Sequence, residues 1–198
     1  PIQDDAKKNM DEIIGEMLED GMKVIAVAKK EMITTGEITC ADENHMILLG
    51  YLTFFDAPKK SAKEAIKKLR DLEVRTKILT GDRKDVALSV CQRVGVNCSR
   101  ILTGQEIENL EESQLQTAVE YGEVFAELTP NQKVEIIQVL RENGHTVGFL
   151  GDGLNDVPAI CEADVGISVD TAVDAAKDAA DVVLLDKDLN VLEEGILE

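Results

Sequence analysis

The stretch VGFLGDGLNDVPA, residues 147–159, decides the fold. It starts as a short apolar run typical of a buried strand, passes through a glycine-rich polar turn, and enters a helix near Pro158. A buried strand followed by a turn and a helix is the repeating unit of a parallel sheet covered by helices. The polar residues of the turn are Asp152, Asn155 and Asp156. Oxygen ligands of this kind at the tip of a buried strand suit Mg²⁺.

The same alternation of strands and helices surrounds this stretch. Strands are predicted at residues 75–79, 124–126, 146–150, 165–168 and 182–185. Helices are predicted at 61–72, 83–94, 130–143, 156–163 and 171–179, with acidic helical turns at 105–121. The fold class is therefore α/β, with a doubly wound parallel sheet whose ligand site lies beyond the carboxyl ends of the strands.

The first part of the chain has a different pattern. Apolar residues at helical spacing between residues 10 and 18 predict a helix that Gly21 ends, and strands are predicted at 24–28 and 46–52. Residues 36–44 form a polar connection between these strands. We place a domain boundary there, which gives domains of residues 1–45 and 46–198.

Composition and charge exclude several classes of protein. With 44% hydrophobic residues, the 198-residue chain can bury a core, which a disordered chain cannot. Its formal charge of −18 argues against nucleic acid as a partner, because an acidic surface repels phosphate backbones. No apolar stretch approaches the roughly 20 residues of a membrane helix. The four cysteines form no C-x-x-C pair and are expected to be reduced thiols.

Two further polar turns carry candidate residues. Thr80, Gly81 and Asp82 follow one predicted strand, and Lys133 falls in the first turn of a predicted helix. A cation is unfavourable at a helix N-terminus, so a shared anion would explain Lys133. Ordinary alternatives exist, because Asp82 and Asp156 are good N-caps and Lys133 can be a solvated surface lysine.

Together, the three turns bring a hydroxyl, a lysine and a pair of carboxylates to one sheet edge. This set can hold a phosphoryl group and Mg²⁺. A nucleophile is missing from it. The sequence Asp186-Lys187-Asp188 follows an apolar strand without a catalytic loop, so it is predicted to be a loop with exposed charges.

These motifs resemble, in order, the signatures of P-type cation-transporting ATPases, over residues 80–82, 129–133 and 151–159. Further stretches resemble the magnesium-transporting subfamily, at residues 50–56, 145–150 and 165–174. The resemblance covers essentially the whole chain. It implies a Rossmann-like, haloacid dehalogenase-type parallel sheet, preceded by the end of an α+β nucleotide-binding domain.

The resemblance implies catalytic and phosphate-binding roles at the sheet edge. Thr80, Gly81 and Lys133 would contact the transferred phosphoryl group, and Asn155 would support the phosphate. Glu127 stands where related pumps more often have a basic residue. A carboxylate near phosphate is repulsive unless it points away or pairs with a cation.

The resemblance also implies a metal site and contacts with nucleotide. Asp152 would hold Mg²⁺ directly, and Asp156 would help to hold the site. Asp82 would reach the nucleotide, as would Lys23, which stands where such pumps usually have an arginine near the ATP phosphates. Mg²⁺ is thus the expected cofactor and ATP the expected substrate.

The phosphorylated aspartate of the family, in the sequence D-K-T-G-T, occurs nowhere in the chain. The chain is therefore expected to be an inactive cytoplasmic fragment of a multi-pass cell-membrane pump. That pump would couple ATP hydrolysis, through an aspartyl-phosphate, to transport of a cation, with Mg²⁺ indicated by the subfamily. The rest of the pump, namely its membrane helices and its actuator and nucleotide-binding domains, would be the partner.

Loss of a central strand has a structural consequence. The strands before Thr80 and Asp152 would either lie apart with unpaired edges or pair directly. We expect the fragment to compensate by closing the gap or by self-association. The alternative functions are a soluble haloacid dehalogenase-like phosphatase and a non-catalytic module that binds Mg²⁺ or nucleotide.

Overall fold

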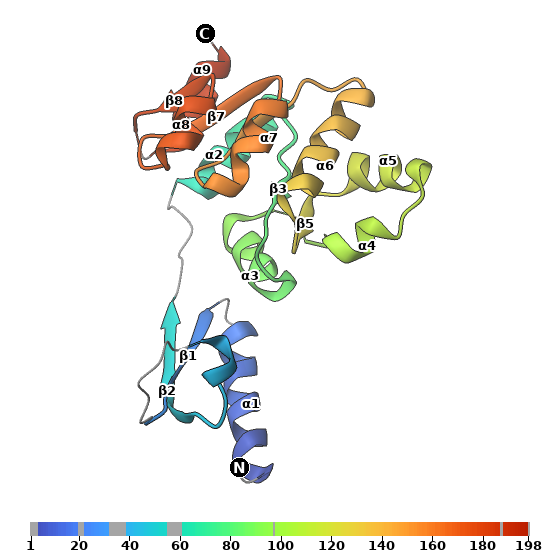
Figure 1. Ribbon diagram of the computed structural model, residues 1–198. Helices are drawn as coiled ribbons and strands as arrows, with labels where there is room; N and C mark the ends of the chain where they lie inside the picture. The colour runs from blue at the N-terminus through green and yellow to red at the C-terminus, as the bar shows by residue number, and fades with distance from the viewer. Residues whose placement is uncertain are drawn as a thin grey trace. The chain divides into compact units, whose positions relative to one another are not determined.

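The computed structural model describes residues 4–19, 22–31, 39–54, 61–96, 98–186 and 188–197 (Figure 1). Contacts within the chain divide it into two compact units, Pro1–Ala57 and Pro58–Glu198. In the ranges that the structure describes, no helix is both long enough and apolar enough to cross a membrane.

The first unit consists of a helix and an antiparallel pair of strands. Its elements are α1 (Asp4–Glu19), β1 (Lys23–Lys29), the short 3₁₀ helix η1 (Cys40–Asp42) and β2 (Ile47–Phe54). Lys23 stands opposite Phe54 in the strand pair. Because β2 pairs with β1, the contacts divide the chain at 57/58, twelve residues after the boundary that the sequence places at 45/46. The assignment of the two domains stays a prediction.

The second unit alternates helices and strands. Its first half contains α2 (Ala62–Asp71), β3 (Ile78–Leu79), α3 (Lys84–Val94), β4 (Ile101–Thr103), α4 (Gly104–Glu108), α5 (Glu112–Tyr121), β5 (Val124–Ala126) and α6 (Pro130–Glu142). Its second half contains β6 (Gly148–Leu150), the 3₁₀ helix η2 (Leu154–Asp156), α7 (Val157–Glu162), β7 (Val165–Val169), α8 (Asp174–Ala179), β8 (Val182–Leu184) and α9 (Val191–Leu197). The α/β class is confirmed.

The strands of this unit form two parallel sheets. In the first sheet β5 lies between β3 and β4, and Val124 pairs with both Ile78 and Ile101. In the second sheet β7 lies between β6 and β8, and Ile167 pairs with both Leu150 and Val182. Among the described residues β3 and β6 are edge strands that do not pair with each other. Of the two arrangements expected from the sequence, the strands therefore lie apart and do not pair directly. Self-association, the other expected compensation, stays a prediction.

Several elements differ from the sequence-based expectation. The predicted helical turns at 105–121 are two helices, α4 and α5, and the predicted helix at 156–163 begins as η2. Strand β4 and helix α9 were not predicted. The loop predicted at residues 186–188 is consistent with the structure at Asp186 and Asp188, whereas Lys187 lies outside the described residues.

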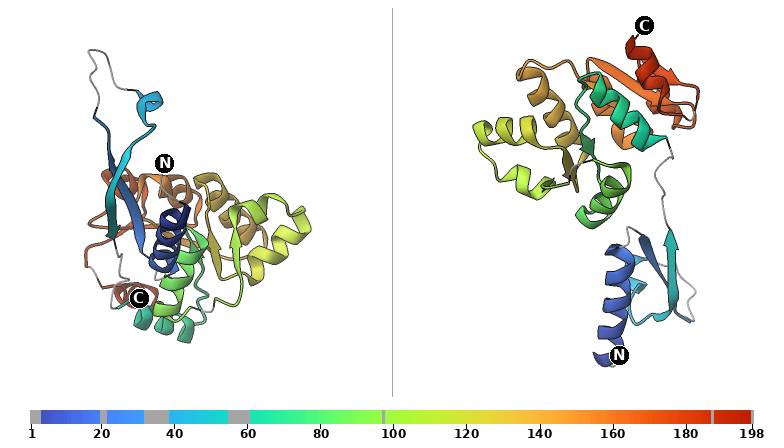
Figure 2. Two further views of the ribbon diagram at one scale, coloured as in Figure 1. Left: turned by 90° about the horizontal axis from the view of Figure 1, so that it is seen from below. Right: turned by 180° about the vertical axis from the view of Figure 1, so that it is seen from behind.

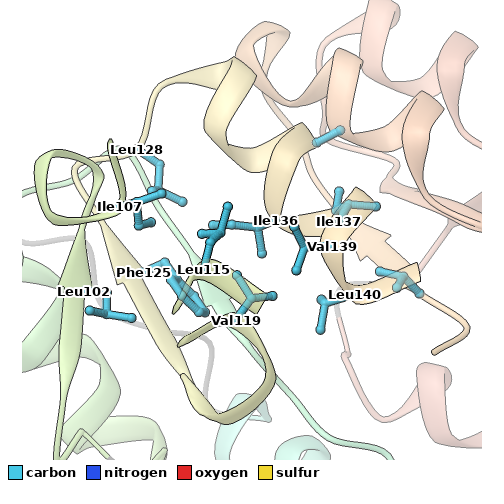
Figure 3. Packing of buried hydrophobic residues seen from close by; sticks show 12 residues of the cluster. Leu102, Ile107, Leu115, Val119, Phe125, Leu128, Ile136, Ile137, Val139 and Leu140 are labelled. Carbon is cyan, nitrogen blue, oxygen red and sulfur yellow. The ribbon is translucent and has the colours of Figure 1, made fainter. Parts of the chain in front are cut away.

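The main core lies around β5 and the helices that pack on it (Figure 3). Phe125, at the centre of β5, is fully buried beside Leu115 and Val119 of α5. Helices α5 and α6 lie side by side in every view (Figure 2). The cluster consists of Leu102, Ile107, Leu115, Val119, Phe125, Leu128, Ile136, Ile137, Val139, Leu140, Val147 and Ala159. Since Val147 and Ala159 flank β6, this core also connects the two sheets.

A repeated aspartate aligns the strands of the second sheet. Asp164 precedes β7, and its Oδ2 accepts a hydrogen bond from the backbone N–H of Val147 at 2.9 Å. Asp181 precedes β8 and accepts in the same way from Gly166 at 2.8 Å. Each aspartate thus satisfies a backbone donor near the start of the neighbouring strand, which would otherwise lack a partner.

Candidate functional site

The loop after β3 is held in place by the loop after β5. The Thr80 N–H donates to the carbonyl of Phe125 at 2.9 Å, and the Thr80 carbonyl accepts from Leu128 N–H at 3.0 Å. A Cβ on Gly81 would lie 3.3 Å from the Leu128 carbonyl oxygen, so the two loops approach closely there. The Thr80 hydroxyl accepts from Asp82 N–H at 3.0 Å, which leaves its own proton to donate.

The N-terminus of α3 is capped by a residue from the same neighbouring loop. The N-cap position is Arg83, which makes no side-chain cap, so Asp82 does not have the N-cap role considered from the sequence. Instead, Glu127 Oε1 accepts from Lys84 N–H at 3.1 Å. Glu127 has a left-handed backbone, with φ of 56°, and its N–H donates to the Asp82 carbonyl at 2.9 Å. Its carboxylate therefore faces the positive end of a helix.

Helix α6 begins in a capping box and places a lysine one residue further along. Thr129 and Gln132 satisfy each other's backbone N–H groups, and Pro130 occupies the first turn. Lys133 follows, and it is only 8% exposed. Its Nζ lies 2.6 Å from Asp156 Oδ1, so the anion that the sequence required is a carboxylate of the protein. The alternative of a solvated surface lysine is wrong.

Asp156 organises the turn after β6. While Oδ1 contacts Lys133, Oδ2 accepts from Gly153 N–H at 3.2 Å, and Asp156 makes no side-chain cap on α7. Gly151 has no room for a side chain, because a Cβ there would lie 2.6 Å from the Cβ of Asp156. The same turn is fixed from β7 by Ser168, a fully buried residue whose hydroxyl donates to the Gly151 carbonyl at 2.9 Å.

The structure joins most of the predicted site residues into one chain of contacts. The Thr80–Asp82 loop is hydrogen-bonded to Leu128, and the residue after Leu128, Thr129, begins the capping box of α6. Lys133 lies in the first turns of that helix and forms an ion pair with Asp156. Asp152 and Asn155 lie exposed in the Asp156 turn. Lys23 lies exposed on β1 in the first unit, and its role near nucleotide stays a prediction.

The two predicted metal ligands differ in availability. Both oxygens of Asp156 are already used within the protein. Within the described ranges the Asp152 carboxylate makes no hydrogen bond or ion pair, while Val173 N–H fixes its backbone carbonyl at 3.1 Å. No group of three or more His, Cys, Asp and Glu gathers there as a metal cage among the residues described. One free carboxylate fits Mg²⁺, which keeps several waters and takes one or two protein ligands.

Sequence reasoning missed the supporting roles of Thr129, Gln132 and Ser168, and it named Glu127 without finding its role as a helix cap. The Thr129-x-x-Gln132 spacing is a recognisable capping-box signal. No local signal marks Glu127 or Ser168, because their partners lie 43 and 17 residues away.

The sequence matches known proteins along its whole length. It is 48% identical over 181 residues to magnesium-transporting ATPase, P-type 1, of Salmonella typhimurium, covering 90% of this chain and 20% of that protein. It is 42% identical over 199 residues to the Escherichia coli K12 protein of the same name, covering all of this chain and 22% of that protein. Calcium-transporting ATPase 1 of Bacillus cereus is 31% identical over 185 residues, covering 92% of this chain and 21% of that protein.

These matches confirm the resemblance to P-type ATPases, with higher identity to the magnesium-transporting proteins than to the calcium-transporting one. The chain spans about a fifth of the length of these curated relatives. Residues 9–164 also match the haloacid dehalogenase-like hydrolase family, a range that holds all the predicted site residues, Lys23 included. The chain therefore belongs to the haloacid dehalogenase-like hydrolases.

Proposed function

We propose that the chain is a cytoplasmic fragment of a P-type ATPase that couples ATP hydrolysis, through an aspartyl-phosphate, to transport of a cation across the cell membrane. The observation that carries the proposal is the buried Lys133–Asp156 pair, held next to the Thr80 loop and the exposed Asp152. The identity to magnesium-transporting relatives supports Mg²⁺ as the transported cation. The remaining parts of such a pump are the proposed partners.

In this proposal each loop contributes one function at the phosphoryl group. Thr80 donates its free hydroxyl proton to a phosphoryl oxygen, and the Gly81 backbone allows that oxygen to come close. Lys133 supplies positive charge and needs no reorganisation, because Asp156 already fixes its ammonium group. Asn155, exposed in the same turn, supports the phosphate through its amide.

The metal role falls mainly on Asp152. Its carboxylate is exposed and uncommitted, while Asp156 acts through Lys133 and through the Gly153 N–H. A bound Mg²⁺ would neutralise phosphoryl charge at this turn. Asp82 and Lys23 are the proposed contacts to ATP, from the second and first units respectively.

The same reasoning makes the 198-residue chain inactive by itself, since it contains no D-K-T-G-T aspartate to act as nucleophile. Strands β3 and β6 each have one unpaired edge among the described residues, and an added strand can bond to either edge. These edges also support the proposal that the isolated chain self-associates.

The test compares this chain with a longer polypeptide from the same source that includes an upstream D-K-T-G-T. Both are incubated with Mg²⁺ and γ-labelled ATP and then quenched in acid. We expect label on the longer protein only, and Asp152→Asn or Lys133→Ala should abolish it. Asp178→Asn, an exposed carboxylate on α8, is the matched control and should keep the label. Label on the 198-residue chain, or normal labelling of Asp152→Asn, would overturn the proposal.

A further inference from the structure

Two cysteines belong to one apolar cluster of the second unit, on the side of α3 where Glu127 caps the helix. Cys91 on α3 is fully buried, and Cys98, after the end of that helix, is partly buried. Both belong to one apolar cluster, together with Val94, Val96 and Ile101. Two thiols of the same chain, seven residues apart, thus lie in the same apolar cluster.

The hydrogen bonds define the state of each thiol. The Cys98 S–H donates to the Val96 carbonyl, with 3.1 Å between Sγ and O. A second hydrogen bond joins the thiols of Cys91 and Cys98. Because a thiol has a single proton, Cys91 is the donor in this second bond and Cys98 the acceptor. Burial is the main cause that raises the pKa of the Cys91 thiol to about 12, and the neighbouring Cys98 adds to it. Cys91 therefore keeps its proton.

Of the two cysteines, only Cys98 lines a cavity of about 580 Å³. Charged residues of both signs share this lining, namely Arg83, Lys84, Asp85, Arg100, Glu106 and Glu127. Small polar molecules can thus reach Cys98.

We propose that Cys91 and Cys98 form an oxidisable dithiol, which a hydroperoxide converts to an intramolecular disulfide and a small thiol reductant reopens. The Cys98 sulfur attacks one peroxide oxygen as the thiol gives up its proton, and the O–O bond breaks. The leaving oxygen takes up that proton and departs as water or alcohol, and Cys98 becomes a sulfenic acid. The Cys91 sulfur then attacks the sulfur of the resulting sulfenic acid. The S–S bond forms, the S–O bond breaks, and the hydroxide leaves with the Cys91 proton as water. The two thiols thereby supply the two electrons that reduce the peroxide.

The other cysteines offer a contrast within the same chain. Cys40 and Cys161 are both exposed, and neither packs against another cysteine among the described residues. Oxidation of these thiols leads to sulfenic acid or to links between chains, and not to an internal disulfide.

The test uses the full chain with Cys40→Ser and Cys161→Ser, so that only the proposed pair remains. We expect hydrogen peroxide to remove both titratable thiols, with a mass loss of about 2 Da in a monomer. Peptide mapping should link Cys91 to Cys98, and dithiothreitol should restore both thiols. In the matched control, which adds Cys98→Ser, the buried Cys91 should keep its thiol at the same peroxide dose. Circular dichroism confirms that both variants are folded.

Two results would overturn the inference. One is oxidation of Cys98 to the sulfinic acid, a gain of about 32 Da, while Cys91 remains a free thiol. The other is loss of the Cys91 thiol in the Cys98→Ser control at the same rate, which would show that Cys91 reacts directly. Neither result depends on whether the chain is part of an ion pump.

Discussion

At the scale of single residues, the Lys133–Asp156 pair explains an unfavourable placement. A lysine near a helix N-terminus faces the positive end of the helix dipole, and Lys133 tolerates this because the Asp156 carboxylate lies 2.6 Å away. Their side chains are only 10% and 15% exposed, so water screens neither charge well. Removing one partner would leave the other charge buried and uncompensated.

Substitution of Lys133 by methionine should therefore lower the free energy of unfolding by about 3 kcal/mol. The matched control is Lys177→Met, which breaks the ion pair with Asp174, a residue that is 92% exposed. That surface pair should contribute less than about 1 kcal/mol. Urea unfolding followed by circular dichroism measures both. Equal effects of the two substitutions would contradict the importance of the buried pair.

A second residue-scale prediction concerns pH. The Glu120 carboxylate accepts hydrogen bonds from Arg75 and from His145, which lower its pKa to about 2. The bond from Arg75 has the larger effect. Because the folded pKa lies below the ordinary value of 4.5, this group stabilises the fold above pH 4.5. That contribution is lost as the pH falls from 4.5 towards 2.

Glu120→Gln should therefore be less stable than the wild type at pH 6, and the difference should shrink as the pH falls from 4.5 towards 2. Urea midpoints measured across this range test the prediction. Glu142→Gln, at an exposed position, should show no such convergence. If the difference in stability between Glu120→Gln and the wild type stays constant down to pH 2, the hydrogen bonds do not favour the carboxylate over the protonated carboxyl group.

At the scale of elements, α3 depends on a distant residue for its first turn. Glu127 accepts from Lys84 N–H across 43 residues of sequence, where the N-cap residue Arg83 offers no side-chain bond. The cap also ties α3 to the loop after β5, and hence to the Thr80 loop.

Glu127→Ala should destabilise the protein by about 1 kcal/mol, as expected for loss of an N-cap. It should also speed amide hydrogen exchange at Lys84. Glu135→Ala, at an exposed position of α6, is the control and should change neither quantity appreciably. Unchanged exchange at Lys84 in Glu127→Ala would argue against the cap.

The same elements show what a sequence can and cannot predict. Strand β5 was predicted with its observed bounds, because a short apolar run between polar turns leaves few alternatives. Strand β4 was missed because its three residues run directly into α4. The separation into two sheets, the helix cap by Glu127 and the bond from Val147 N–H to Asp164 depend on residues far apart in sequence, which local patterns do not reveal.

At the scale of the whole molecule, the second unit contains everything needed for its own core. Among the residues that the structure describes, the three apolar clusters consist of residues from that unit. In its described residues the first unit contributes α1, η1 and the β1–β2 pair, with exposed apolar side chains such as Ile25, Leu52 and Phe54.

Residues 58–198 expressed alone should therefore fold as they do in the full chain. We expect their amide resonances to overlay those of the 198-residue protein, except next to the new terminus. Residues 1–57, whose two strands leave apolar side chains exposed, should show little stable structure alone. Loss of dispersed resonances from residues 58–198 would show that the second unit needs the first.

The strand order also determines when each sheet can form while the chain is synthesised on the ribosome. In the β6–β7–β8 sheet each new strand pairs with the one made just before it, so that sheet can grow as the chain emerges. In the other sheet the middle strand β5 is made last, and neither β3 nor β4 has a partner until residues 124–126 leave the exit tunnel. The loop that carries Thr80 is thus translated early but can take its final form only some 45 residues later. During that interval the nascent chain is most open to proteases and most in need of chaperones.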